Sequence, residues 1–506
     1  MLHIAVRADA SNTIGAGHFM RCLALIKCIK KAFGAENKTL KVTFICADIN
    51  SYCTTKILEG EFSLIKVTNN YLNAPAWLKL DSQQTEQALS SLDKVHVLIV
   101  DSYRIQEPWY SDNIKSLCSK VLVIDDLANR KHYCHYLLDQ TLDVKNERYR
   151  KLVPNTCQIM VGKSYMLLRE EFLQWRNKAL LKRNKTKSIK NILVSLGGSD
   201  PTAINLTIIN AITIINKHLG APLSVNLVVP KNSQSADTYK TLEKENSWLT
   251  VQFDTNDMAR LMYYADIAIG ASGSSAWERC CLGLPTLAIE LADNQALVLD
   301  RLSSHGAIIN LGKSATLTPQ KIQQTLVALL NSNTQYLSLS KKAACCCDGK
   351  GSLRVLEKLN LSKVYLRPAT LEDRDLLFNW QSQASVRKYS RTNHNISFDE
   401  HSHWYENTLR NTNRNLFIIT EQWLGGTESP VGMLRLDLQG EQYEVSILIC
   451  PSQQGRGLAK KALDAISIDF KRLPILATVH PENIPSQILF SKAGFKKISK
   501  DLFILK

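Results

Sequence analysis

The chain has 506 residues, of which 45% are hydrophobic and 21% charged, and its formal net charge is +16. This length predicts about three domains of ordinary size, and the apolar fraction excludes a disordered chain. No apolar run reaches the roughly 18 residues that a membrane helix needs, and the first residues lack a signal-peptide pattern. The 13 cysteines include no Cys-x-x-Cys pair. We therefore expect no metal site, no disulfide framework, no membrane partner and a cytoplasmic location.

The positive charge raises nucleic acid as a partner, but its distribution argues against one. Charge is spread nearly in proportion to length, and the one clear basic run lies at 176–190, with seven basic residues and no acid. Aromatic residues do not alternate with these charges as they would in a groove for single strands. We interpret the run as a solvated connector rather than a nucleic-acid groove. A mildly basic protein would also suit a small substrate that carries phosphate.

Residues 1–155 have the pattern of a parallel α/β domain. Short apolar runs alternate with helical or polar stretches. They are His3–Val6, Val42–Cys46, Val95–Val100 and Val121–Ile124. Three runs end in acids, namely Asp48, Asp101 and Asp125-Asp126. Strand ends of this kind commonly face ligands in open sheets.

A glycine turn follows the first of these strands. Gly15 and Gly17 precede His18 and a helical pattern, which places the histidine in the first turn of a helix. Glycines let the backbone approach a ligand, and the positive end of a helix disfavours an imidazolium, so His18 is a candidate general base. The alternative is a capping or buried histidine. The nearby Arg7 and Asp9 join the motif, and with Gly15 and Gly17 they are candidate substrate-binding residues. Asp9 would orient His18 or cap a turn.

Residues 156–350 repeat the strand pattern, which predicts a second Rossmann-like domain and a cleft between the two. In the stretch 270–278, Ser274 and Ser275 follow a strand, so their amides can hold a diphosphate while Glu278 accepts from ribose hydroxyls. The alternative is a capping box between Ser275 and Glu278. Ala292-Asp293-Asn294-Gln295 ends the next strand and favours the binding interpretation. Gly197-Gly198-Ser199-Asp200 is either a helix-capping turn or part of the same cleft.

Residues 363–506 predict an α+β domain, because their strands are grouped before a helix rather than alternating with helices. The stretch Gln454-Gly455-Arg456-Gly457-Leu458-Ala459 fits Gln-x-x-Gly-x-Ala between a strand and a helix. Consecutive backbone N–H groups in such a loop form a nest for a pyrophosphate. The downstream Asn483 and Ala493-Gly494-Phe495 strengthen this interpretation.

Three groups of motifs together resemble known families. Residues 1 to about 345 resemble the family of UDP-2,4-diacetamido-2,4,6-trideoxy-β-L-altropyranose hydrolases of pseudaminic acid biosynthesis, which has a GT-B-like fold. Residues 363–506 resemble GNAT N-acetyltransferases that act on nucleotide-linked amino sugars. The hydrolase resemblance rests on the glycine and His18 motif, Asp125-Asp126-Leu-Ala-Asn129-Arg130, Leu168-Arg169-x-Glu171-Phe172, the Gly197 and Gly273 motifs, and Ala292–Gln295.

The hydrolase resemblance implies that His18 activates water against the anomeric carbon, and that Gly273–Glu278 with Asn294 and Gln295 hold UDP. Because a diphosphate already leaves well, one base and an anion cradle are enough, without the two carboxylates of most glycosidases. Arg21 would steady the diphosphate or form a salt bridge. Tyr103 would contact the sugar or pack in the core.

The acetyltransferase resemblance implies that the 454–459 loop and Asn483 bind acetyl-CoA. Many GNAT proteins place a tyrosine where this chain has Phe490, which has no proton to give. Glu444 and His403 are the candidates for accepting the amine proton. Their alternatives are a cross-strand salt bridge and a surface histidine.

The fusion predicts two consecutive steps on one nucleotide sugar. Acetyl-CoA would acetylate the 4-amino group of a UDP-linked amino sugar, and water would then release UDP from the diacetamido product. The competing interpretations are a GT-B glycosyltransferase, which would need an acceptor site, and a non-catalytic nucleotide-sugar binding protein.

Overall fold

The computed structural model describes residues 1–11, 15–33, 40–68, 76–197, 200–231, 233–390, 394–423 and 428–505; the side chain of Asn294 also lies outside this description. The chain divides into two compact units, which we describe separately. One contains His3–Val355, and the other contains Leu356–Lys506 together with Met1–Leu2.

The first half of the larger unit is a seven-stranded sheet in the order β3-β2-β1-β4-β5-β6-β7. The pairs β1–β4, β2–β3, β4–β5, β5–β6 and β6–β7 are all parallel. The order places β4 directly beside β1, with Asp101 opposite Ala8. The elements are β1 (Leu2–Ala8), α1 (Gly17–Phe33), β2 (Leu40–Cys46), α2 (Ser51–Glu59), β3 (Ser63–Lys66), α3 (Trp77–Ser90), β4 (Val95–Asp101), α4 (Asp112–Leu117), β5 (Cys118–Ile124), β6 (Tyr136–Asp139) and β7 (Gln158–Val161).

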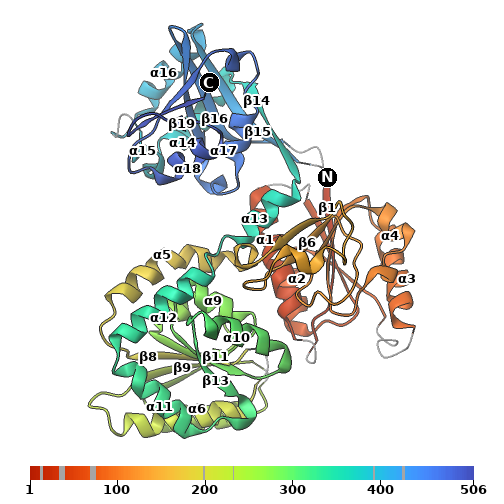
Figure 1. The fold of residues 1–506 in the computed structure, drawn as a ribbon, viewed down its shortest axis with the longest axis vertical. Helices are drawn as coiled ribbons and strands as arrows, with labels where there is room; N and C mark the ends of the chain where they lie inside the picture. The colour runs from red at the N-terminus through yellow and green to blue at the C-terminus, as the bar shows by residue number, and fades with distance from the viewer. Residues whose placement is uncertain are drawn as a thin grey trace. The chain divides into compact units, whose positions relative to one another are not determined.

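The second half is a six-stranded parallel sheet in the order β10-β9-β8-β11-β12-β13, and Figure 1 shows helices on both of its faces. Its elements are α5 (Glu170–Lys185), β8 (Asn191–Ser195), α6 (Thr202–Asn216), β9 (Ser224–Val229), α7 (Ala236–Glu245), β10 (Leu249–Phe253), α8 (Met258–Tyr264), β11 (Ile267–Ala271), α9 (Ser275–Cys281), β12 (Thr286–Glu290), α10 (Ala296–Ser304), β13 (Ile309–Lys313), α11 (Pro319–Leu330), α12 (Asn333–Cys346) and α13 (Gly351–Leu359).

The central strands β8, β11 and β12 of this second sheet are mostly apolar because both of their faces are covered. Ile192 and Val194 of β8 pack in the core on the α6 and α11 side, whereas Leu193 packs in the core on the α9 and α12 side. Side chains alternate between the faces of a strand, so a sheet buried on both faces requires a continuous apolar run. This is why the strands could be predicted from short apolar runs.

Most of the basic run at 176–190 lies in helix α5, and two of its arginines bind the ends of other helices. This corrects the expectation that the run is a solvated connector. Arg183 of α5 is fully buried and donates to the carbonyls of Met262 (2.6 Å) and Ala265 (2.7 Å) at the end of α8. Arg176 donates to the carbonyls of Ala344 and Cys347 at the end of α12. Cations are favourable at helix C-termini, where the last carbonyls lack partners within the helix.

The smaller unit contains a seven-stranded mixed sheet in the order β14-β15-β16-β17-β18-β20-β19. Its core lies on both faces, against α17 and α18 on one side and α14 and α16 on the other. The elements are β14 (Ser362–Pro368), α14 (Arg374–Gln381), α15 (Ala384–Arg387), α16 (Phe398–Arg410), β15 (Arg414–Trp423), β16 (Glu428–Gln439), β17 (Gln442–Ile449), α17 (Leu458–Asp464), β18 (Ile475–Thr478), α18 (Ile484–Lys492), β19 (Lys496–Lys497) and β20 (Leu502–Leu505).

The two central strands of this sheet separate soon after they meet. β17 and β18 pair in parallel only at Tyr443 with Ile475 and at Glu444 with Leu476. β17 continues to Ile449 beyond this pair. The separation leaves the backbone of β17 without a β18 partner beyond Glu444, next to the loop that leads to α17.

Candidate functional site

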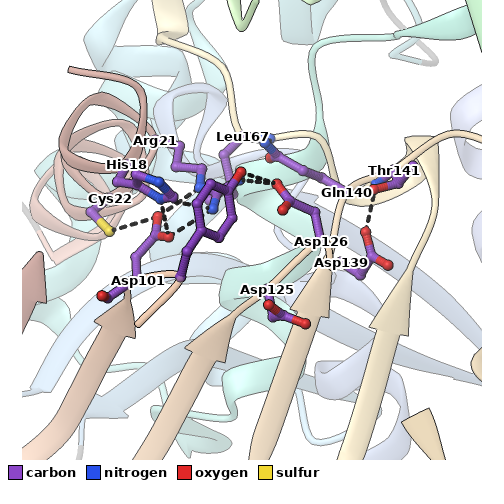
Figure 2. Close-up of polar contacts among 12 residues, drawn as sticks. His18, Arg21, Cys22, Asp101, Asp125, Asp126, Asp139, Gln140, Thr141 and Leu167 are labelled. Carbon is purple, nitrogen blue, oxygen red and sulfur yellow. Dashed lines mark hydrogen bonds and ion pairs between the residues drawn. The ribbon is translucent and has the colours of Figure 1, made fainter. Parts of the chain in front are cut away.

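His18 lies in the first turn of α1 and is held by the end of a neighbouring strand. Its Nδ1 is 2.6 Å from Asp101 Oδ1, at the carboxyl end of β4 (Figure 2). Arg21 Nη2 is also near Nδ1, at 3.1 Å. An ionised carboxylate can only accept, so Nδ1 carries the hydrogen and the lone pair lies on Nε2. Among the described residues, Nε2 has no hydrogen-bond partner, and the His18 side chain is 10% exposed. This arrangement can take a proton from a bound molecule.

Arg21 keeps Asp101 ionised. Its Nε and Nη2 donate to the two carboxylate oxygens, at 2.6 and 2.7 Å. Burial alone would raise the pKa of Asp101, but the ion pair with Arg21 holds that pKa well below its ordinary value. Arg21 Nη1 also pairs with Asp126 at 3.0 Å. Arg21 therefore forms the salt bridge that was one of its two expected roles.

Tyr103 contacts the side chains of His18 and Asp126. Its ring meets the His18 ring edge-on, with centroids 4.4 Å apart, and its hydroxyl donates to Asp126 at 3.2 Å. Burial, reinforced by the Asp126 carboxylate, raises the pKa of Tyr103, so its hydroxyl stays protonated. Tyr103 thus contacts the imidazole directly instead of packing in an apolar core.

Arg7 and Asp9 form contacts with each other and with neighbouring elements of the same domain. Arg7 is fully buried and pairs with Asp9 and with Asp81 of α3. Asp9 also accepts from the backbone N–H of Ala47 at 2.8 Å. It is Asp101, not Asp9, that orients His18. Gly15 adopts a left-handed backbone (φ +80°) in the turn before α1, which explains a glycine there.

The loop after β11 carries the residues expected to bind a diphosphate. Ser274 is exposed and Ser275 is half-buried, and no side-chain cap is present at α9. The capping box between Ser275 and Glu278 is therefore not formed. Glu278 instead accepts from Arg169 Nη2 at 2.9 Å. Arg169 also pairs with Glu171 at 2.9 Å, so it joins α5 to α9.

The polar residues after β12 lie beside the same loop. Gln295 Nε2 would lie 3.8 Å from a side-chain carbon at Gly273, and Gln295 Oε1 accepts from the N–H of Leu291. The side chain of Asn294 and the residues Gly198 and Ser199 lie outside the described part of the structure. Their neighbour Asp200 accepts from Tyr239 at 2.6 Å and ties this loop to α7.

A cavity of about 360 Å³ opens beside the Arg169 and Glu278 pair. Helices α1 and α2 line one side of it, while Arg169, Glu171 and Asn256 line another. Lys56 reaches across to Asn256 at 2.8 Å. His18 does not line the cavity. The cavity is therefore not evidence that a substrate binds beside the imidazole.

The loop between β17 and α17 is shaped by two glycines and fixed by a buried arginine. Gly455 and Gly457 have φ of +83° and +75°. Arg456 is only 6% exposed, and its guanidinium pairs with Glu421 of β15 at 2.7 Å. The side chain of Arg456 therefore holds the loop.

The remaining predicted residues of the smaller unit lie on three elements. Glu444, 8% exposed on β17, accepts from Thr478 (2.8 Å) and from Gln439 of the neighbouring strand (3.0 Å). His403 is exposed on α16, with Nδ1 2.9 Å from the carbonyl of Asp399. Asn483 caps α18 by accepting from the N–H of Ser486.

Phe490 is buried against Phe495, with ring centroids 5.0 Å apart, so α18 presents a ring without a hydroxyl there. Within the described ranges, no group of three or more His, Cys, Asp or Glu side chains could hold a metal ion. Nor does that part of the chain contain a helix long and apolar enough to cross a membrane.

Comparison with known proteins assigns the smaller unit. Residues 363–496 match the family model of the acetyltransferase (GNAT) domain. The C-terminal part of the chain is a GNAT domain. The uncharacterized protein MJ1062 of Methanocaldococcus jannaschii is 24% identical over 99% of this chain and 98% of its own length, so a relative matches both units together.

The larger unit resembles a UDP-sugar hydrolase in sequence and MurG in fold. The UDP-2,4-diacetamido-2,4,6-trideoxy-beta-L-altropyranose hydrolase of Campylobacter jejuni is 25% identical over 60% of this chain and 97% of its own length. The crystal structure of Acinetobacter baumannii MurG matches with a TM-score of 0.50 and 17% identity, covering 70% of this chain and 98% of MurG. These findings confirm the resemblance and the GT-B-like fold predicted from the sequence.

Proposed function

We propose that this protein is a bifunctional nucleotide-sugar enzyme. Its hydrolase part, 1–155 with 156–350, would release UDP from UDP-2,4-diacetamido-2,4,6-trideoxy-β-L-altropyranose. Its acetyltransferase part, 363–506, would acetylate the 4-amino group of the UDP-amino-sugar precursor with acetyl-CoA. The observation that carries the hydrolase proposal is the hydrogen bond between His18 Nδ1 and Asp101, because it leaves the Nε2 lone pair for a water molecule. The Campylobacter hydrolase supports the choice of substrate.

In the hydrolytic step, the water oxygen attacks the anomeric carbon and the bond from that carbon to the diphosphate oxygen breaks. Nε2 of His18 takes the water proton, and the ionised Asp101 stabilises the imidazolium that forms. UDP leaves as an anion. The loop with Ser274 and Ser275 would hold that anion, and Glu278 and Gln295 would bind the nucleoside. Tyr103 would contact the sugar beside the imidazole.

In the acetylation step, the amine nitrogen of the sugar attacks the thioester carbonyl and the carbon–sulfur bond breaks. The 454–459 loop would hold the pyrophosphate of acetyl-CoA through its backbone N–H groups. The pantetheine arm would lie where β17 and β18 separate. Glu444, at that separation, is the better placed acceptor for the amine proton, and His403 is the second candidate. Because Phe490 has no hydroxyl, either another group or solvent would protonate the departing thiolate.

The decisive experiment supplies the full-length protein with acetyl-CoA and the UDP-linked 4-amino sugar and follows the products by mass spectrometry and proton NMR. We expect a gain of one acetyl group on the nucleotide sugar, followed by UDP and a free diacetamido sugar. UDP release with water as the only acceptor separates hydrolysis from glycosyl transfer. An absolute need for a second sugar would contradict the proposal.

His18→Ala tests the proposed base. We expect hydrolysis to fall by about 10²- to 10⁴-fold, the usual contribution of a general base, while the affinity for UDP stays nearly unchanged. His218→Ala, which removes an exposed histidine at the end of α6, is the matched control and should hydrolyse normally. Normal hydrolysis by His18→Ala would refute the mechanism.

A further inference from the structure

The loop after β11 covers a buried cation that forms no ion pair with a carboxylate among the described residues. Arg279 of α9 is 1% exposed. Its Nη1 donates to Ser275 Oγ at 3.1 Å, its Nη2 donates to the carbonyl of Ala271, and its Nε has no partner in the described structure. The adjacent carboxylate, Glu278, pairs with Arg169 instead. Burial lowers the pKa of Arg279 to about 10, as expected for a cation without a counter-ion.

The backbone is adapted to hold this guanidinium under the loop. A side-chain carbon at Gly270 would lie 2.7 Å from Arg279 Nη1, 2.9 Å from its Cζ and 2.9 Å from the carbonyl oxygen of Ser195. Because glycine has no side-chain carbon, it leaves this space for the guanidinium. A buried, unpaired charge is costly, so its retention needs a partner that the protein alone does not supply.

A second buried arginine shows what is unusual about the first. Arg183 is also fully buried without a paired carboxylate, but it donates to three carbonyls at the C-terminus of α8, where the helix favours a cation. Arg279 instead lies at the loop that leads into α9, and there it donates to a serine hydroxyl. Because Ser275 Oγ accepts from Arg279, its hydrogen is directed to another acceptor, as in a site for an anion.

We propose that Arg279 is a positioning residue that serves as the buried counter-charge for the diphosphate of the substrate. This inference rests on the proposed function. The guanidinium acts through the loop: it orients the Ser275 hydroxyl as a donor and places a positive charge under the phosphates without touching them. The chemical class recognised is a nucleoside diphosphate. The affinity for the uncharged nucleoside should not depend on the charge of Arg279.

Isothermal titration of the full-length protein with UDP and with uridine tests this inference. Arg279→Met should weaken UDP binding by about tenfold or more, the effect of one partly screened charge, and change uridine binding by less than about twofold. Arg183→Met, the matched control, should leave the ratio of the two affinities as in the wild type. Equal weakening of both ligands by Arg279→Met would overturn the inference but leave the proposed function standing. Failure of the wild type to bind UDP would instead overturn the proposed function.

Arg279→Lys decides the question if the methionine variant does not fold. Lysine keeps the charge at pH 7, so the preference for UDP over uridine should stay within about threefold of the wild type. A buried lysine loses its proton more readily than arginine does, so this preference should fall between pH 7 and 9 in the variant alone. Identical pH profiles for the variant and the wild type would refute the counter-charge.

Discussion

At the residue scale, the site depends on the pairing of His18 with Asp101, two residues that are 83 positions apart. Asp101→Asn keeps the size of the side chain but removes the charge that stabilises an imidazolium. The amide can also donate to Nδ1 and favour the wrong tautomer. We predict that hydrolysis falls by about 10²- to 10⁴-fold while the Kd for UDP stays within about twofold, measured by steady-state kinetics and titration. A large loss of UDP affinity would show that Asp101 maintains the fold of the site instead.

The sequence predicts His18 because its signal is local: two glycines, a strand before them and a helix after them. It did not select Asp101 as the partner, because proximity along the chain favoured Asp9. The strand order brings β4 beside β1, so that Asp101 lies opposite Ala8. Asp9 is already taken by Arg7 and by the N–H of Ala47. The apolar run before Asp101 is the only signal that could have identified it.

His132 gives the stability of the larger unit a predictable pH dependence. The residue is 2% exposed, neither ring nitrogen has a partner in the described structure, and burial lowers its pKa to about 4. The unfolded chain takes up this proton below about pH 6.5. The stabilisation is therefore complete above pH 6.5 and is lost as the pH falls toward 4, by about 2–3 kcal/mol. We predict that His132→Leu flattens this part of the curve of unfolding free energy against pH in urea titrations; parallel curves would contradict it.

At the element scale, basic residues of α5 stabilise the domain that contains the second sheet. From the sequence alone, the same residues suggest an exposed, solvated segment. Arg183 of α5 is fully buried against the end of α8. We predict that Arg183→Met lowers the free energy of unfolding by about 2–4 kcal/mol, because three carbonyls lose a charged donor. Lys182→Met is the matched comparison. Lys182 donates to Tyr264 and pairs with Asp266 but is half-exposed, so its loss should cost less, about 1 kcal/mol. Equal costs in chemical denaturation would contradict this distinction.

Strands with continuous apolar runs could be predicted from the sequence. The role of α5, which binds the ends of other helices, could not. The central strands of both parallel sheets are buried on two faces, and their sequences are short apolar runs. The basic residues of α5 give it the same amino-acid composition as an exposed connector. Only the positions of α8 and α12 show that these charges bind carbonyls.

At the scale of the whole molecule, the chain consists of two compact units, His3–Val355 and Leu356–Lys506 with the first two residues. The described residues form hydrophobic cores within each unit: those cited for the larger unit lie among residues 5–347, and those for the smaller unit among residues 364–505. The family match covers only the smaller unit, whereas the archaeal relative covers both. Separate cores and separate proposed ligands mean that each unit can be stabilised on its own.

We therefore predict two thermal transitions in calorimetry of the full-length protein. UDP at a hundred times its Kd should raise the midpoint of one transition, since such saturation adds about 2.7 kcal/mol to the stability of the state that binds. Coenzyme A at the corresponding concentration should raise the other. In His18→Ala, the shift with UDP should persist, because the imidazole acts on water and contributes little to nucleotide binding. A single transition that both ligands raise together would show that the two units unfold cooperatively, and the assignment of one ligand to each unit would then need the separate titrations.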